Sequence, residues 1–254
     1  LEFRRVLFRS PATYDEGERA RLYDTLDRRL AAGRQLAGVL LTHHHHDHVG
    51  SAVSVARRHG LAVHAHPETF ERVELPGVET VPLLDGETID LGTAPDGTPG
   101  WHLTAHETPG HARGHLVFID SRYRTAIVGD LVSTLSTIVI DPPEGHMATY
   151  IASLQRVLEL DIGVLIPAHG VPQRVGADTL RYHLARREQR EEKLVGALRA
   201  GARSAAELLP VVYDDAPEAI RPVAARSLLA GLEKLAEEGR ARSEGERWAL
   251  AAEA

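Results

Sequence analysis

The sequence predicts a layered α/β protein followed by a smaller winged-helix domain. Helical and strand patterns alternate over most of the first 173 residues, and the apolar segments repeatedly end at a histidine or an aspartate. After residue 173 the pattern changes to helices that lead into a β-hairpin. Because alternating helices and strands stack as layers, we expect one α/β domain over residues 11–173 and a second domain over residues 174–254.

The first helix of the α/β domain is predicted over residues 16–32. Leu22, Leu26 and Leu30 recur there at four-residue spacing, and Gly33 can end the helix. The apolar segment 36–41 then predicts a strand buried on both faces. The elements expected after it are a helix at 49–59, strands at 61–65, 88–91, 101–108, 116–119 and 125–129, a helix at 147–160 and a strand at 162–166.

A dense group of candidate metal ligands follows strand 36–41. The residues read His43-x-His45-x-Asp47-His48. In an extended segment, side chains two positions apart point the same way, so His43 and His45 can reach one ion. Asp47 and His48 lie where the chain turns into the next helix, and we expect them to project to a second position beside the first.

Later strands end at three further candidate ligands, His111, Asp130 and His169. His44 and His46 occupy the alternate positions of the first motif and are expected to point away from the metals. Strand ends gather at one edge in open α/β sheets, and seven such side chains suffice for two ions. The chain has no cysteine, so the ligands are nitrogen and oxygen, which suits zinc, iron or manganese.

The composition limits the function classes. The formal net charge of −7 provides no general attraction to nucleic acid. No apolar run approaches the roughly 18 residues of a membrane span, and no segment resembles a signal peptide. We therefore expect a cytoplasmic protein without a membrane partner; the sequence leaves its oligomeric state open.

These motifs resemble the metallo-β-lactamase superfamily. The resemblance spans about residues 16–171 and rests on His43-x-His45-x-Asp47-His48, Thr108-Pro109-Gly110-His111, Gly129-Asp130 and Pro167-Ala168-His169-Gly170. It implies an αββα sandwich with two zinc ions. It also implies a division of the ligands: His43, His45 and His111 for one zinc, Asp47, His48 and His169 for the other, and Asp130 as the bridge.

The N-terminus departs from the family pattern. The family has a β-meander with an Asp-Pro-Gly turn before the first motif, whereas only 42 residues precede His43 here, and a predicted helix fills most of them. Residues 1–10 show no clear period. We expect them to be foreign or vector-derived sequence joined to an N-terminally truncated sandwich; a genuine edge strand is the alternative.

Residues 174–254 resemble the winged-helix tail of the β-lactamase-like protein 2 group within this superfamily. Asp178 is expected to cap a long helix at 179–200, and Ser204 and Glu207 form a capping-box pattern before a short one. A further helix at 218–238 and a hairpin of strands 240–243 and 247–250 complete the pattern.

The charge of this domain favours a scaffold over a DNA reader. Residues 174–254 contain 14 basic and 14 acidic residues, whereas a duplex-binding face usually carries a basic patch. Binding to duplex DNA is therefore not expected. Arg221 and Arg226 are the residues that a nucleic-acid role would use.

The predicted activity is hydrolysis by a metal-bridging hydroxide. Asp47 would bind a metal and orient the water or accept its proton, and His115, near His111, is a candidate for stabilising the oxyanion. Resemblance to the β-lactamase-like protein 2 group implies cleavage of single-stranded RNA, as in its animal members; the substrate expected is single-stranded RNA or a small molecule. The alternatives are a glyoxalase-II-like thioester hydrolase and a catalytically silent metal-binding regulator.

Overall fold

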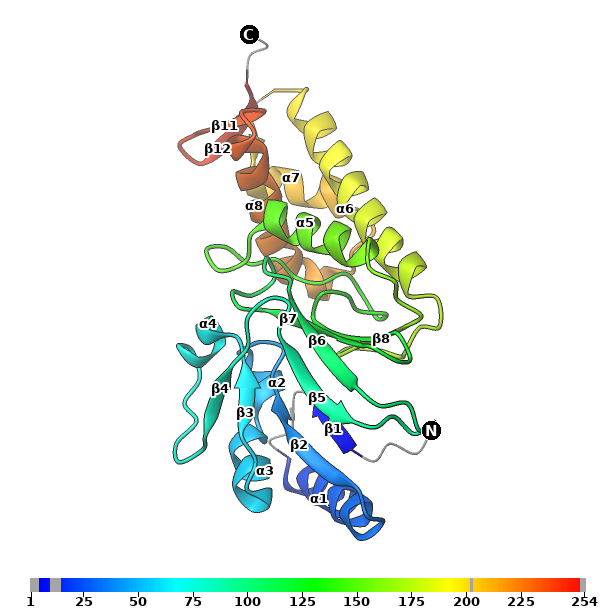
Figure 1. The fold of residues 1–254 in the computed structure, drawn as a ribbon. Helices are drawn as coiled ribbons and strands as arrows, with labels where there is room; N and C mark the ends of the chain where they lie inside the picture. The colour runs from blue at the N-terminus through cyan, green and yellow to red at the C-terminus, as the bar shows by residue number, and fades with distance from the viewer. Residues whose placement is uncertain (1–4, 10–14, 202, 252–254) are drawn as a thin grey trace.

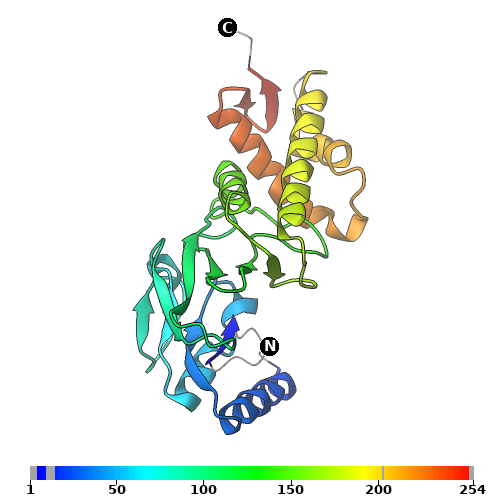
Figure 2. The same ribbon diagram turned by 45° about the vertical axis from the view of Figure 1, so that its right-hand side comes forward.

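The computed structural model describes residues 5–9, 15–201 and 203–251. Two β-sheets stack face to face, and helices cover the outer side of each (Figure 1). A mainly helical domain lies beyond the second layer of helices, and the view in Figure 2 shows the same order of layers. The predicted αββα sandwich followed by a winged helix is confirmed.

The first sheet is parallel throughout. Its strands in spatial order are β1 (Arg5–Arg9), β2 (Gln35–Leu40), β3 (Val63–Ala65) and β4 (Thr80–Pro82). Helices α1 (Glu16–Ala31) and α3 (Ala52–His59) pack on its outer face. Val39 of β2 contacts this helix layer, whereas its neighbour Leu40 contacts the second sheet, so the strand is covered on both faces as predicted.

The second sheet is antiparallel except at one edge. Its order is β5 (Thr88–Gly92), β6 (Trp101–Glu107), β7 (Leu116–Asp120), β8 (Thr125–Gly129) and β9 (Val164–Pro167), and β9 runs parallel to β8. Buried and half-buried residues alternate along β6, which places Trp101, Leu103 and Ala105 in the core between the sheets. This alternation was predicted from the sequence.

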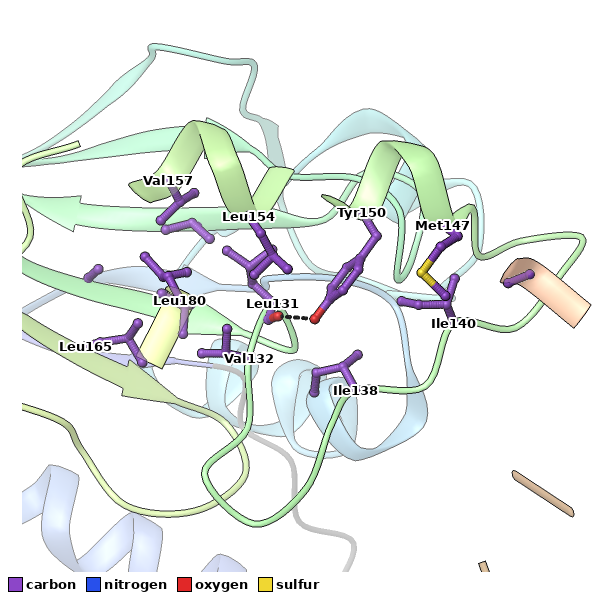
Figure 3. Packing of buried hydrophobic residues seen from close by; sticks show 14 residues of the cluster. Leu131, Val132, Ile138, Ile140, Met147, Tyr150, Leu154, Val157, Leu165 and Leu180 are labelled. Carbon is purple, nitrogen blue, oxygen red and sulfur yellow. Dashed lines mark hydrogen bonds between the residues drawn. The ribbon is translucent and has the colours of Figure 1, made fainter. Parts of the chain in front are cut away.

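Helix α5 (Met147–Leu158) covers the outer face of the second sheet. Figure 3 shows Tyr150, Leu154 and Val157 pointing from this helix into a fully buried cluster. The Tyr150 hydroxyl donates a hydrogen bond of 2.9 Å to the backbone oxygen of Leu131. The polar tip of this tyrosine therefore has a partner in the core, and it fixes the loop that follows Asp130.

The C-terminal domain contains α6 (Gly176–Leu198), β10 (Arg203–Ser204), α7 (Ala205–Val212), the 3₁₀ turn η1 (Glu218–Ile220), α8 (Arg221–Glu237), β11 (Ala241–Glu244) and β12 (Arg247–Leu250). The capping box of Ser204 and Glu207 forms as predicted. The three strands pair in the order β10-β12-β11. Of the helices that the structure describes, none is long and apolar enough to cross a membrane.

Local differences from the sequence prediction concern helix starts and short elements. The prediction that Asp178 caps α6 is wrong, because the helix begins at Gly176 and Asp178 lies in its first turn. The helix predicted over 49–59 is split into α2 (His46–Val49) and α3. Helix α4 (Pro67–Phe70) and strand β4 were not predicted; they span four and three residues.

The predicted foreign segment, residues 1–10, lies partly outside the described residues. Positions 1–4 and 10 are not described, whereas residues 5–9 form β1 and pair in parallel with β2. The backbone of this segment thus takes an edge position in the first sheet, which is the alternative named above. Its foreign origin stays a prediction.

Candidate metal centre

The seven candidate ligands lie in segments that follow strands of the two sheets. His43 follows β2, and His48 lies in the short helix α2 that comes next. His111, Asp130 and His169 follow β6, β8 and β9. The folded chain thereby brings together residues that are up to 126 positions apart in the sequence. All seven belong to groups or ion pairs around one centre.

His43, His45 and His111 form the first group. Nδ1 of His45 lies 3.0 Å from Nε2 of His43 and 3.0 Å from Nε2 of His111. Nδ1 of His111 lies 2.8 Å from the backbone oxygen of Val139 and must donate to it, so its Nε2 carries a lone pair. Burial lowers the pKa of His43 well below its usual value and that of His111 to about 4. Ring nitrogens that converge in this way fit a cation.

Asp47, His48 and His169 form the second group. Nε2 of His169 lies 3.2 Å from a carboxylate oxygen of Asp47. His48 is buried, and among the described residues its Nε2 has no partner with hydrogen-bond geometry. A buried nitrogen without a hydrogen bond costs free energy, so this group also fits an ion.

Asp130 lies between the two groups. Its Oδ1 is 3.3 Å from Nε2 of His48, and its Oδ2 is 3.4 Å from Nε2 of His169 and 3.7 Å from Nε2 of His111. Burial alone would raise the pKa of Asp130, but the neighbouring histidines, His48 foremost, lower it to about 2. The carboxylate is therefore ionised at neutral pH and faces both groups.

Thr42 and two glycines shape the site, and the sequence prediction gave none of them a role. The buried Thr42 hydroxyl lies 3.1 Å from Nδ1 of His43 and 3.5 Å from Nδ1 of His48, on the side of each ring away from the centre. Gly110, before His111, has a φ of 120°, and a Cβ there would lie 2.3 Å from the Tyr150 nitrogen. Gly129, before Asp130, has a φ of 48° and lies against Thr42.

His44 and His46 belong to neither of the two groups. His46 is exposed. His44 instead contacts a carboxylate that the sequence prediction missed: its Nε2 lies 2.9 Å from Oε1 of Glu144. The other oxygen of Glu144 lies 3.8 Å from Nε2 of His45. The only sequence signal for Glu144 is its place in a Pro- and Gly-rich loop before a helix.

The structure does not support the oxyanion role predicted for His115. This side chain is fully buried, and its Nε2 accepts a hydrogen bond of 3.1 Å from the backbone N–H of Asp130. Its Nδ1 therefore carries the proton and donates to the Thr108 hydroxyl at 2.7 Å. Burial lowers the pKa of His115 to about 3. A neutral ring with both nitrogens occupied cannot meet a substrate oxygen, and His115 instead holds the backbone at Asp130.

This fold and this cluster of histidines and aspartates define a metal-binding hydrolase class. The family model of the metallo-beta-lactamase superfamily matches residues 12–169, and the chain belongs to that superfamily. The beta-lactamase associated winged helix domain matches residues 204–248. The two matches correspond to the sandwich and to the C-terminal domain.

Among curated proteins, the chain is 27% identical to the beta-lactamase-like protein 2 homolog of Drosophila melanogaster, over 80% of this chain and 70% of that protein. It is 37% identical to a hydroxyacylglutathione hydrolase of Acidiphilium cryptum, but over 52% of this chain and 49% of that protein.

Two solved structures add to the comparison. A beta-lactamase domain protein from Burkholderia ambifaria superimposes with a TM-score of 0.80 at 20% identity, over 96% of this chain and 81% of that one. TTHA1623, solved in a di-iron-bound form, has a TM-score of 0.52 at 26% identity, over 66% of this chain and 84% of that one. The first similarity shows that sandwich and C-terminal domain occur together in one known fold.

Proposed function

We propose that this chain is a hydrolase with two metal ions, zinc in preference to iron or manganese. The observation that carries the proposal is the position of Asp130, whose carboxylate lies near histidines of both groups: His48 and His169 of the second, and His111 of the first. His43, His45 and His111 would hold the first ion, Asp47, His48 and His169 the second, and Asp130 would contact both. The similarity to TTHA1623, which holds two irons, supports a pair of ions and keeps iron a candidate.

Two bound ions would lower the pKa of a shared water toward about 7 and polarise the bond that is broken. The protein side chains would do the rest. Asp130 is ionised and balances the positive charge of the centre. The Asp47 side chain is 59% exposed, so it can orient an attacking water and accept its proton. Burial lowers the pKa of His43 and of His111, so these two rings are neutral and keep lone pairs directed at the centre.

A hollow beside the centre supports single-stranded RNA as the substrate. It has a volume of about 400 Å³, and it is lined by Ser133, Thr134, Leu135, Ser136, Gln173, Asp178, Thr179 and Tyr182. The Thr134 N–H donates to the backbone oxygen of His169, so the hollow adjoins the chain segment that carries this candidate ligand. Leu135 is 76% exposed and Tyr182 57% exposed. An exposed ring beside a cleavage site suits base stacking by a flexible strand.

A thioester is the second candidate substrate. The similarity to the hydroxyacylglutathione hydrolase supports it, because the 37% identity lies in a stretch covering about half of this chain. The exposed Leu135 and Tyr182 would then contact the acyl or glutathione part of the substrate. The two candidates share the ligand set and differ in what occupies the hollow.

The test combines metal analysis with a substrate panel. Purified protein is analysed for bound metal and then assayed on single-stranded RNA, S-lactoylglutathione, a lactone and a simple phosphodiester, with His45→Ala as the control. We expect two ions per chain and turnover of RNA that His45→Ala abolishes. Turnover that survives His45→Ala would contradict the two-metal proposal. Preference for S-lactoylglutathione would favour the thioester hydrolase. Bound metal without turnover of any substrate would favour the catalytically silent regulator.

A further inference from the structure

We propose that the C-terminal domain orients the ligands of the first metal position through one loop, residues 138–146, in which Glu144 is a positioning residue. The inference rests on the proposed two-metal function. The loop connects the region after Asp130 to helix α5, and it touches the first histidine group on one side and the C-terminal domain on the other.

The loop contacts two rings of the first group, those of His45 and His111, on the side away from the centre. The backbone oxygen of Val139 accepts the hydrogen bond from Nδ1 of His111 at 2.8 Å. Glu144 places one oxygen 2.9 Å from His44 and the other 3.8 Å from Nε2 of His45. With Nδ1 of His45 directed at the centre, its opposite nitrogen thus faces a carboxylate. At 3.8 Å this contact is electrostatic and not a hydrogen bond, and it favours the ring orientation in which Nδ1 of His45 is directed at the centre.

The same loop is tied to the turn that carries His111. The His146 N–H donates to the backbone oxygen of Gly110 at 2.8 Å. The Gly145 N–H donates to the backbone oxygen of Asp141 at 2.7 Å and closes the loop around Glu144. Gly145 has no room for a side chain, because a Cβ there would lie 2.5 Å from the Asp141 nitrogen. The position of Glu144 is thus set by tight backbone packing.

Helix α8 holds the other side of the loop. Arg226 donates from Nε to a carboxylate oxygen of Asp141 at 2.5 Å, and from Nη2 to the backbone oxygen of Pro142 at 2.8 Å. The buried Ser227 hydroxyl accepts a hydrogen bond of 2.9 Å from the Ile140 N–H. These contacts join residues more than 80 positions apart.

Helix α6 adds a third attachment. Arg187 donates to the backbone oxygen of Ile138, and its guanidinium lies 4.9 Å from the centre of the Tyr150 ring. Arg187 is 5% exposed. An arginine buried to this degree holds its partners in a fixed geometry, because a change would leave its charge without them. The start of the loop is therefore anchored at the same interface.

The contacts of loop 138–146 with the candidate ligands involve the first metal position. Within the described residues, the hydrogen bonds and ion pairs given above run from the loop to His44, His45, Gly110 and His111. The second position is held differently, by the Thr134 N–H on the His169 backbone oxygen and by Asp47 on the His169 ring. A disturbance of the loop should therefore weaken one metal position more than the other.

The test measures zinc binding to the full chain by competition with a chromophoric chelator. Glu144→Gln keeps the shape of the side chain and removes its charge, and Arg226→Gln removes the ion pair of α8 with Asp141, one of the contacts between this helix and the loop. We expect Glu144→Gln to weaken one of the two binding events about 10- to 100-fold, with the other within about twofold. Arg226→Gln should weaken the same event by a smaller factor. Cobalt in place of zinc should show an altered visible spectrum for that site alone.

Arg242→Gln is the matched control, because Arg242 lies in the same domain and pairs with Glu244 on the hairpin surface. The two zinc affinities of this variant should equal those of the parent protein. Equal weakening of both events by Glu144→Gln, or no weakening of either, would overturn the inference while the two-metal proposal stands. A parent protein that binds no zinc would overturn both.

Discussion

At the scale of single residues, the site depends on side chains that touch no substrate. Thr42 and His115 are buried behind the candidate ligands, and each contacts a ligand or its backbone. Asp130 is the residue on which these constraints converge: its backbone N–H donates to His115, and its carboxylate lies near histidines of both groups. Its charge, rather than its size, should be what the centre requires.

Asp130→Asn tests that requirement. The amide is nearly isosteric, but it cannot supply the negative charge that the carboxylate, with a pKa of about 2, carries at neutral pH. We expect both zinc-binding events to weaken, with a loss beyond the roughly 100-fold typical of an outer partner. Asp161→Asn is the control, since the Asp161 side chain is exposed and forms an ion pair with Arg124, away from the candidate ligands. Unchanged affinity of both zinc-binding events in Asp130→Asn would refute the bridging role.

Gly110→Ala tests the turn before His111. A φ of 120° strains any side chain, and the new Cβ would meet the backbone of Tyr150 at 2.3 Å. We expect a loss of about 1–3 kcal/mol in the free energy of unfolding, measured in urea, together with weaker zinc binding. Gly196→Ala in α6 is the matched control, since nothing lies within 4 Å of its added Cβ. It should be neutral or stabilise by up to about 1 kcal/mol.

At the scale of elements, α6 connects the two domains into one packed unit. Leu180 near its start belongs to the core beneath α5, whereas Leu194 and Leu198 near its end belong to the core of the C-terminal domain. Between them, the buried His183 lies 2.9 Å from the backbone oxygen of Ser133, its hydrogen-bond partner. Burial lowers the pKa of His183 to about 4. The helix therefore carries a neutral histidine at the domain junction.

This histidine should make the folded state sensitive to acid. Its pKa is about 4 in the folded chain and about 6.5 when unfolded, so the unfolded state binds the extra proton between these values. The free energy of unfolding is therefore unaffected by the titration of His183 above about pH 6.5, and this titration lowers it progressively as the pH drops toward 4. From pH 7.5 to 5 the loss is about 2 kcal/mol.

His183→Gln isolates this contribution from that of the other histidines. Urea unfolding of the metal-free parent and variant would be compared at pH 7.5, 6.5, 5.5 and 5. We expect the stability of the variant to fall by about 2 kcal/mol less over that range. Parallel curves for the two proteins would show that His183 does not contribute.

How far the sequence predicts the elements depends on the range of the interactions that form them. Strand ends and ligands were predictable because alternation and apolar runs are local signals, as in β6 and in His43-x-His45. Strand β4 was not, since its three residues include a proline and it forms only by pairing with β3. The contacts of Glu144 and the ion pair of Arg226 with Asp141 were not predictable from the sequence. In that pair, 85 positions separate the arginine from its aspartate. His115 was misassigned because nearness in sequence does not reveal which way a buried ring points.

At the scale of the whole molecule, the cations of the C-terminal domain are largely engaged with carboxylates of the same chain. The pairs are Arg186–Asp215, Arg190–Asp215, Lys193–Asp214, Lys234–Glu191, Arg240–Glu238, Arg242–Glu244 and Arg247–Glu207. Arg226, one of the two residues named for a nucleic-acid role, pairs with Asp141 of the sandwich. Phosphate groups would have to displace these carboxylates.

We therefore expect no useful affinity for duplex DNA. A fluorescein-labelled 30-base-pair duplex, titrated with the protein at about 150 mM salt, should show no anisotropy change up to about 10 µM. A labelled single-stranded RNA, with cleavage blocked by His45→Ala, is the comparison. A submicromolar Kd for the duplex that depends on Arg221 would contradict the scaffold interpretation.

The attachment of loop 138–146 to α8 also decides how this protein can be recombined with its relatives. The loop belongs to the sandwich by sequence position, but its shape depends on Arg226 and Ser227 of the other domain. A chimera joined at residue 174 would exchange one side of that contact and keep the other. A chimera that keeps its metal binding should instead take loop 138–146 and the C-terminal domain from the same parent. The unit that can be exchanged between relatives is therefore larger than the C-terminal domain that the sequence delimits.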